Sequence, residues 1–90
     1  MEIRSFLWNE GTIDHIAHHR VAPEEIEEVA FDGSPYSRKG RQGRRYLYGK
    51  TLGGRYLFVV YVLVARGSAQ VITARDMDEK ERRLYLKRGK

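Results

Sequence analysis

The stretch RYLFVVYVLVA, residues 55–65, decides the fold, because it holds the longest apolar run in the chain. Its apolar side chains fall on both faces of an extended chain, which is typical of a central strand covered on both sides. The run Tyr56–Ala65 has about half the length of a membrane-spanning helix, so it does not predict a membrane protein. We therefore expect a buried strand in the middle of a sheet.

Turn signals bracket this strand on both sides. Gly53-Gly54 is a two-residue turn of the kind that closes hairpins, and it predicts a preceding strand at Arg44–Leu52. Arg66-Gly67-Ser68 predicts a second turn, followed by a strand at Ala69–Arg75. The polar, glycine-bearing segment Ser37–Gly43 predicts a mobile loop. The second half of the chain thus predicts an antiparallel β-meander.

The first half of the chain carries helix signals. A short apolar strand is expected at Glu2–Trp8, and Asn9 is an N-cap residue type for a helix that runs to about Arg20. Pro23 suits the first turn of a second helix, which ends at Asp32 and the glycine and proline after it.

A third helix is expected at Asp78–Arg88, where Asp78 and Glu81 form a capping-box pattern. The elements together predict an α+β fold with two N-terminal helices, an antiparallel β-meander sheet and a C-terminal helix. Ninety residues make one domain, which we expect to span residues 1–90.

Composition excludes several functional classes. The chain has no cysteine, which removes disulfide frameworks, thiolate zinc sites and cysteine nucleophiles. The start, Met1-Glu2-Ile3-Arg4, lacks an apolar run behind a basic head, so we expect no secretory signal, no membrane partner and a cytoplasmic location. The 17 Lys and Arg residues exceed the 12 Asp and Glu residues, and the resulting charge of +5 predicts an anionic partner, most simply nucleic acid.

A basic segment, Ser37–Arg55, is the strongest functional signal. It contains no acid and seven bases: Arg38, Lys39, Arg41, Arg44, Arg45, Lys50 and Arg55. In the expected strand, Arg44, Tyr46, Tyr48 and Lys50 alternate onto one face, whereas Arg45 points the other way. Such a face can follow a phosphate backbone and stack bases, so the segment predicts a nucleic-acid-binding surface. The alternative is a solvated basic hairpin whose charges discourage aggregation at a sheet edge.

A group of three side chains near the C-terminus predicts a catalytic site. Glu81 and Tyr85 are one helical turn apart, and Arg75 ends the preceding strand six residues before Glu81. A carboxylate, a phenol and a guanidinium where sheet meets helix suit acid–base and electrostatic catalysis. The alternative is a structural Arg–Glu pair beside a packed tyrosine.

Histidine supplies a further candidate for proton transfer. We select His19, because an imidazole takes both protonation states near neutral pH; the alternative is a histidine that caps carbonyls at a helix end. His15 and His19 have the spacing of zinc-binding helices, but Ile16 stands where that motif has its glutamate, and no third ligand is evident. We therefore expect no metal and no cofactor.

Several stretches resemble the BrnT family of type II toxins. They are Phe6-Leu7-Trp8-Asn9, His18-His19-Arg20-Val21, Pro23-Glu24-Glu25, Arg44, Gly49, the run from Gly54 to Tyr61, Val71-Ile72-Thr73-Ala74-Arg75 and Glu81-Arg82-Arg83-Leu84-Tyr85. The resemblance spans nearly the whole chain and implies a fold similar to that of RelE-type ribonucleases. It implies a ribonuclease toxin that cleaves RNA without a metal. The expected catalytic residues are His19, Arg44, Arg75, Glu81 and Tyr85, and the expected RNA-binding residues are Arg38, Lys39, Arg41, Arg45, Tyr46, Tyr48 and Lys50.

The resemblance also implies a partner, namely a cognate ribbon-helix-helix antitoxin similar to BrnA, with DNA contacted only through that antitoxin. Arg20 stands where the family has a glycine, so we expect Arg20 to adopt the left-handed conformation at some energetic cost. Ala22 stands in place of a helix-opening serine, so a side-chain cap is expected to be missing. His15 and His18 replace an asparagine and a lysine, which leaves open a non-catalytic RNA- or protein-binding module of the same fold.

Overall fold

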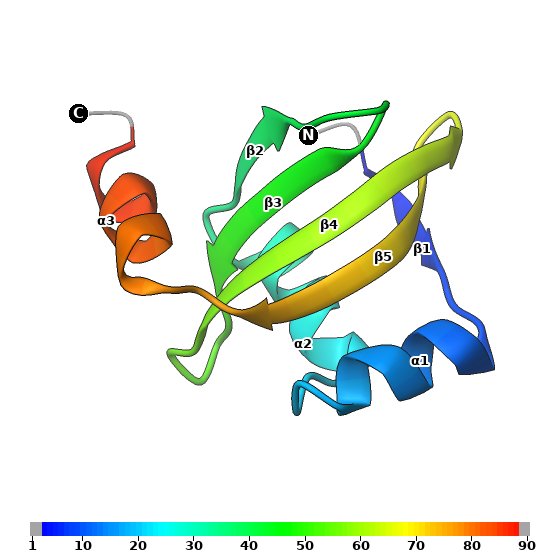
Figure 1. The fold of residues 1–90 in the computed structure, drawn as a ribbon, viewed down its shortest axis with the longest axis horizontal. Helices are drawn as coiled ribbons and strands as arrows, with labels where there is room; N and C mark the ends of the chain where they lie inside the picture. Colours follow the sequence, from blue (N-terminus) through cyan, green and yellow to red (C-terminus); the bar gives the residue numbers. More distant parts are fainter. Residues whose placement is uncertain (1–2, 89–90) are drawn as a thin grey trace.

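A five-stranded sheet with helices on both faces forms the structure (Figure 1), a computed structural model that describes residues 3–88. The elements are β1 Ser5–Leu7, α1 Glu10–Ala17, α2 Pro23–Glu27, the π-helix η1 Glu28–Asp32, β2 Tyr36–Lys39, β3 Arg45–Lys50, β4 Tyr56–Ala65, β5 Ser68–Asp76 and α3 Glu79–Lys87. Three helices and one sheet confirm the predicted α+β class. Among residues 3–88, no helix is long and apolar enough to cross a membrane.

The strand order is β1-β5-β4-β3-β2, which places β4 at the centre of the sheet as predicted. The four strands β2 to β5 pair antiparallel, in agreement with the meander. The whole sheet is mixed, because β1, which the predicted meander does not include, pairs parallel to β5, with Ser5 opposite Ser68. A three-residue apolar strand carries no information about its direction relative to a partner far along the chain. The expected first residue of this strand, Glu2, lies outside the described residues.

Two buried clusters explain why β4 is apolar on both faces. On one face, Leu47, Val59 and Tyr61 of the sheet pack with Ile16 and Ile26 of the helices α1 and α2. The other face carries a smaller cluster, made of Tyr48, Phe58, Val60, Met77 and Tyr85, part of which comes from α3. Figure 1 shows α3 at the end of the sheet where β5 finishes, away from α1 and α2. The predicted double cover of β4 is therefore confirmed.

The segment predicted as a mobile loop, Ser37–Gly43, instead forms strand β2 and a tight turn to β3. The amide of Arg44 donates to the carbonyl of Arg41 at 3.0 Å, and the two residues between them, Gln42 and Gly43, have φ angles of 58° and 76°. Positive φ at both central residues is typical of the type I′ turns that join twisted strands. The prediction failed because the strand is polar and exposed, and such an edge strand lacks an alternating apolar pattern.

The hairpin between β3 and β4 has a longer loop than the predicted two-residue turn. The strands end at Lys50 and resume at Tyr56, and the amide of Thr51 donates to the carbonyl of Arg55 at 2.8 Å. Within the loop 51–55, Gly54 has a positive φ of 93° and Gly53 does not. A two-residue type I′ turn needs positive φ at both central positions, so Gly53-Gly54 alone does not close this hairpin.

The end of α1 confirms the prediction for Arg20. Its φ is 61°, its amide donates to the carbonyl of Ala17 at 2.9 Å, and the next amide, of Val21, donates to Ile16 at 3.1 Å. These two bonds form a Schellman motif, whose left-handed residue is usually glycine. The regular helix ends at Ala17 rather than at Arg20, because the left-handed residue closes the last turn.

The two later helices begin as the sequence predicts. Ala22 offers no side-chain cap to α2, and the carboxylate of Glu25 accepts the Ala22 amide at 3.0 Å. At the start of α3 the capping box is confirmed: Asp78 Oδ1 accepts the amide of Glu81 at 2.8 Å, and Glu81 Oε1 accepts the amide of Asp78 at 2.9 Å. This box fixes the Glu81 side chain at the junction between β5 and α3.

Candidate active site

The end of β5 and the start of α3 bring Arg75 and Glu81 into direct contact. Arg75 donates from Nη1 to Glu81 Oε1 at 2.8 Å and from Nη2 to Oε2 at 2.9 Å, which is a bidentate ion pair. The Glu81 side chain is 17% exposed and that of Arg75 is 39% exposed. The spacing of six residues therefore predicted a real pair. One edge of the guanidinium is bound to the carboxylate, and a large part of the side chain remains accessible.

The guanidinium of Arg75 also stacks on the sheet. Its Cζ lies 4.6 Å from the centre of the Phe58 ring, and its Nη1 donates to the carbonyl of Asp76 at 3.0 Å. The hydrogen bonds to Glu81 hold the pKa of Arg75 above its ordinary value, so the group is a permanent cation. A fixed cation at a sheet surface is suited to stabilise a transition state in which negative charge develops.

Tyr48 lies beside this pair instead of forming an open platform for bases. The residue is 4% exposed, and its ring packs against Phe58 at 5.1 Å and Tyr36 at 5.9 Å between centroids. Burial raises the pKa of its phenol; the charge of Arg38 lowers this pKa and that of Glu81 raises it. The alternation of Tyr46 and Tyr48 predicted their shared face, but it gave no signal that a second apolar cluster covers Tyr48.

Tyr85 has a different role in the structure from the one its spacing suggested. Its hydroxyl donates to the carbonyl of Ser34 at 2.9 Å, and Arg88 stacks on its ring at 3.8 Å. The residue is 4% exposed and packs against Tyr56. These contacts fasten α3 to the loop after η1, whereas no hydrogen bond joins the Tyr85 hydroxyl to Arg75 or Glu81. The spacing of four residues from Glu81 predicts that Tyr85 lies on the same face of the helix. It does not predict the direction in which the Tyr85 hydroxyl points.

Two histidines, His15 in α1 and His19 in the turn after it, lie near β5, the strand that carries Arg75. The rings of His15 and His19 meet edge to face at 5.7 Å, and His15 Nε2 is 3.0 Å from Thr73 Oγ1 on β5. Thr73 and Arg75 are two residues apart, so they point to the same side of the strand. His19 is exposed, and among residues 3–88 no three His, Cys, Asp or Glu side chains form a group that could hold a metal ion.

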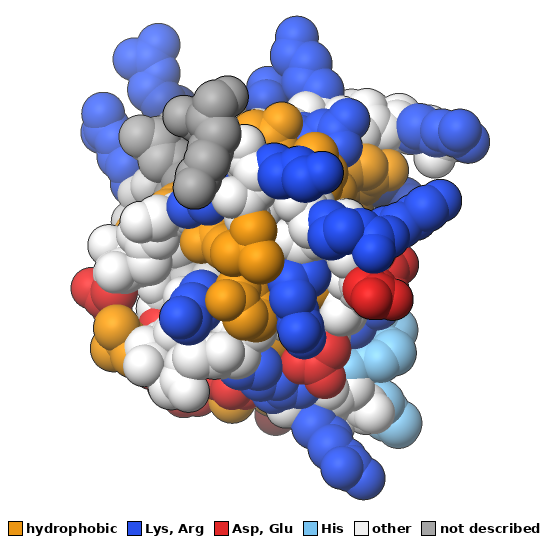
Figure 2. All heavy atoms as spheres, turned by 90° about the vertical axis from the view of Figure 1, so that its left-hand side faces the viewer, with side chains coloured by type: hydrophobic (Ala, Val, Ile, Leu, Met, Phe, Trp, Pro, Cys, Tyr) orange, Lys and Arg blue, Asp and Glu red, His pale blue; other side chains and the backbone are white. Residues whose placement is uncertain are grey.

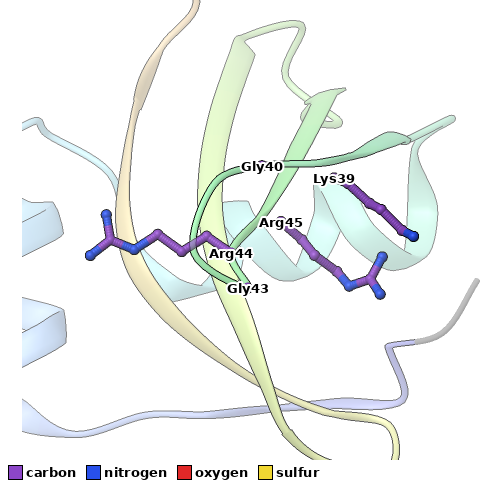
Figure 3. Close-up of a pocket in the computed structure, with 5 residues that line it drawn as sticks. All are labelled: Lys39, Gly40, Gly43, Arg44 and Arg45. Carbon is purple, nitrogen blue, oxygen red and sulfur yellow. The ribbon is translucent and has the colours of Figure 1, made fainter.

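The β2–β3 hairpin carries most of the predicted RNA-binding cations. Lys39 pairs with Arg45 across the hairpin, and Figure 3 shows both side chains on one side, with Arg44 pointing to the other. The opposite directions of Arg44 and Arg45 are as predicted. Together with Gly40 and Gly43 these residues line a hollow of about 270 Å³. Its cationic lining and open shape suit a phosphate group better than an apolar ligand.

The remaining predicted residues extend this surface. Arg38 lies opposite Tyr46 on the neighbouring strand, Arg41 is exposed in the turn, and Lys50 lies 5.5 Å from the Tyr56 ring. Gly40 leaves room for the Tyr46 ring, because a Cβ at position 40 would lie 2.6 Å from a carbon atom of that ring. Figure 2 shows Lys and Arg side chains spread over the face that carries α3, with few acids and with His at one edge.

Arg55 and Asp76 form a second ion pair, which gives a testable pH dependence. Hydrogen bonds from Arg55 hold the pKa of Asp76 below its ordinary value of 3.8. As the pH falls below about 4, the Asp76 carboxylate is therefore protonated in the unfolded chain before it is protonated in the folded chain. The free energy of unfolding decreases as a result. The Asp76 side chain is 62% exposed, so we expect a contribution below about 1 kcal/mol.

We predict that Asp76→Asn weakens the fall in Tm between about pH 5 and pH 2, because the asparagine cannot be protonated. Thermal unfolding followed by circular dichroism at each pH measures this effect. Asp14→Asn, at an exposed position of α1, is the matched control and should leave the pH dependence of Tm unchanged. An Asp76→Asn curve identical to that of the wild type would exclude this ion pair as a source of the pH dependence.

The fold and the site together define a small α+β protein with a cationic hairpin surface and an Arg–Glu pair at the end of its sheet. A family model described as "Ribonuclease toxin, BrnT, of type II toxin-antitoxin system" matches residues 8–81. The chain belongs to this BrnT family of ribonuclease toxins.

A solved structure supports the fold. The chain is similar to the Brucella abortus ribonuclease toxin BrnT, whose crystal structure was determined at 1.1 Å resolution, with a TM-score of 0.68 and 19% sequence identity. The match covers 83% of this chain and 97% of the Brucella chain. At this identity the likeness shows the fold alone, and similarity to RelE-type ribonucleases stays a prediction. No curated protein sequence matches the chain.

Proposed function

We propose that this chain cleaves RNA by attack of the ribose 2′-hydroxyl on the neighbouring phosphate, without a metal ion. The reaction needs a group that takes the 2′-hydroxyl proton, cations that stabilise the phosphorane, and an acid that protonates the leaving oxygen. The observation that carries the proposal is the bidentate Arg75–Glu81 pair, in which the Arg75 side chain is 39% exposed. It lies on β5, the strand that His15 contacts at Thr73, two residues before Arg75. Arg75 supplies the phosphorane cation.

Glu81 holds Arg75 in place in this proposal. Its carboxylate accepts two hydrogen bonds from Arg75 and one from the amide of Asp78. A carboxylate has about four lone-pair positions, so three are in use. We therefore assign proton transfer to His19, which is exposed in the turn after α1: it takes the 2′-hydroxyl proton and gives it to the leaving 5′ oxygen. Arg44 is a second cation for the phosphorane, and Tyr85 supports the site by fastening α3.

RNA binding is assigned to the exposed and half-buried side chains of the hairpin. The residues are Arg38, Lys39, Arg41, Arg45, Tyr46 and Lys50, which lie in β2, β3 and the turn between them. Tyr48 belongs beneath this surface, because it is buried against Phe58. The positive charge of the hairpin supplies affinity that falls as salt rises.

A protein partner completes the proposal. Members of a type II system act with an antitoxin, and for this chain we propose a ribbon-helix-helix protein similar to BrnA, with DNA contacted only through it. We further propose a cytoplasmic location, no membrane partner and a single domain spanning residues 1–90. An acidic segment of the antitoxin that covers the hairpin would neutralise the toxin by charge complementarity.

Expression in bacteria tests the proposed function. We expect the wild-type chain to arrest growth and degrade RNA, and His19→Ala to restore growth, because the loss of a general base or acid costs about 10²–10⁴-fold in rate. Growth curves and RNA gels measure both effects, and His18→Ala is the matched control. RNA binding without cleavage between about pH 5 and pH 9 would instead select the non-catalytic module of the same fold.

A further inference from the structure

Arg55, which immediately precedes β4, contacts four residues in three separate parts of the chain. Its Nε and Nη2 donate to the carboxylate of Asp76 at 2.6 and 3.2 Å, and its Nη1 donates to both Glu25 oxygens at 3.1 and 3.3 Å. Nη1 also donates to the carbonyl of Arg20, and Nη2 donates to that of His19 at 3.1 Å. One side chain thus joins the end of α1, the start of α2 and the end of β5.

These contacts separate Arg55 from the other cations of the basic segment. All three of its nitrogens already donate to acceptors within the chain, and its side chain is 26% exposed. A phosphate would have to displace two carboxylates to reach this guanidinium. Arg55 is therefore unsuited to bind RNA directly, although composition alone groups it with Arg44 and Lys50.

The segments that Arg55 joins carry the two parts of the proposed active site. On one side are the carbonyls of His19 and Arg20, within the turn that holds Arg20 left-handed. On the other side is Asp76, the residue that follows Arg75 and whose carbonyl accepts a hydrogen bond from the Arg75 guanidinium. Three hydrogen bonds therefore connect His19 to Arg75. Arg55 donates to the His19 carbonyl and to the Asp76 carboxylate, and Arg75 donates to the Asp76 carbonyl.

We infer that Arg55 is a positioning residue for RNA cleavage, which fixes the His19 backbone relative to the Arg75–Glu81 pair. The inference rests on the proposed function of His19 and Arg75. The planar guanidinium is needed for this role, because a lysine has one ammonium and cannot bind acceptors in four directions from a rigid fork. Misplacement of a reacting group by about 1 Å can reduce a rate by about 10²-fold.

Steady-state kinetics on an RNA oligonucleotide test this role. We expect Arg55→Lys to lower kcat by about 10- to 100-fold and to change KM by less than about 2-fold, because the RNA-binding hairpin is untouched. Glu25→Gln is the matched control: it removes one ionic partner but keeps the bonds to Asp76 and His19, so kcat should stay within about 2-fold of wild type. Circular dichroism and Tm establish that each variant is folded.

A double-mutant cycle distinguishes positioning from a general loss of structure. If Arg55 acts through His19, then Arg55→Lys should lower the residual kcat of a His19→Ala protein by less than about 2-fold. Equal factors in both backgrounds would overturn the inference, as would an unchanged kcat of Arg55→Lys in the wild type. If Arg55→Lys does not fold, Asp76→Asn replaces it in the same cycle, because it weakens only the contact with β5.

The activity of the wild-type protein distinguishes a failure of the proposed RNA cleavage from a failure of the proposed role of Arg55. A wild-type protein that binds RNA but does not cleave it contradicts the proposed function, and the role of Arg55 fails with it. A wild-type protein that cleaves RNA at the same kcat as Arg55→Lys contradicts the role of Arg55 alone.

Discussion

Arg75→Ala is expected to lower kcat for RNA cleavage by about 10²–10³-fold, the cost of removing one group that stabilises a developing oxyanion. The substitution removes the cation that stacks on Phe58 and leaves Glu81, which is 17% exposed, without its bidentate partner. Cleavage of a labelled RNA oligonucleotide at saturating substrate measures the effect. In cells, the same substitution should abolish growth arrest.

Two further variants make this result specific to the site. Arg75→Lys keeps the charge but loses the bidentate geometry, so its kcat should lie between those of the wild type and Arg75→Ala. Arg83→Ala is the matched control, because Arg83 is an exposed arginine of α3 whose ion pair with Glu79 is 3.7 Å long. If folded Arg75→Ala cleaves RNA as fast as Arg83→Ala, the proposed site is wrong.

Tyr61→Ala is expected to lower the free energy of unfolding by about 3–5 kcal/mol, the usual cost of truncating a large buried aromatic side chain. Tyr61 lies in the centre of β4 with no exposed surface, and its hydroxyl is 3.1 Å from Ser37 Oγ on the edge strand β2. In a domain of this size, that loss lowers Tm by more than about 12 °C. Chemical denaturation followed by circular dichroism measures the change.

The conservative variant separates packing from hydrogen bonding at this position. Tyr61→Phe keeps the ring and loses the contact with Ser37, so we expect a loss of about 1 kcal/mol. Val64→Ala, at a position of β4 that is half exposed, should have a much smaller effect than Tyr61→Ala. A Tyr61→Ala protein as stable as Val64→Ala would contradict the central place of β4 in the fold.

Local rules account for the parts of the fold that the sequence predicted. The apolar run of β4 is explicit in the residues, and the capping box of α3 needs only Asp78 and Glu81. The left-handed Arg20 was expected only from the resemblance, because Arg20 stands where the family has a glycine. By contrast, β2 is too polar to show a strand pattern, and the parallel pairing of β1 depends on residues at the other end of the chain.

The same division applies to the candidate site. Arg75 and Glu81 are six residues apart with a turn between them, so local spacing was enough to predict their contact. The residues that accept hydrogen bonds from the Arg55 side chain lie between 21 and 36 residues away in the sequence. No sequence pattern predicts these contacts. The burial of Tyr48 and the direction of the Tyr85 hydroxyl likewise depend on how α3 packs against the sheet. Tertiary packing therefore decided the details that matter most for chemistry.

The chemical ends of cleaved RNA test the central claim most directly. Wild-type protein is incubated with a defined RNA oligonucleotide in EDTA, and mass spectrometry identifies the termini. Attack by the 2′-hydroxyl predicts a 2′,3′-cyclic phosphate on one fragment and a 5′-hydroxyl on the other, with no cleavage of a 2′-deoxy substrate. Fragments that end in 3′-hydroxyl and 5′-phosphate groups, or cleavage that EDTA abolishes, would contradict the account.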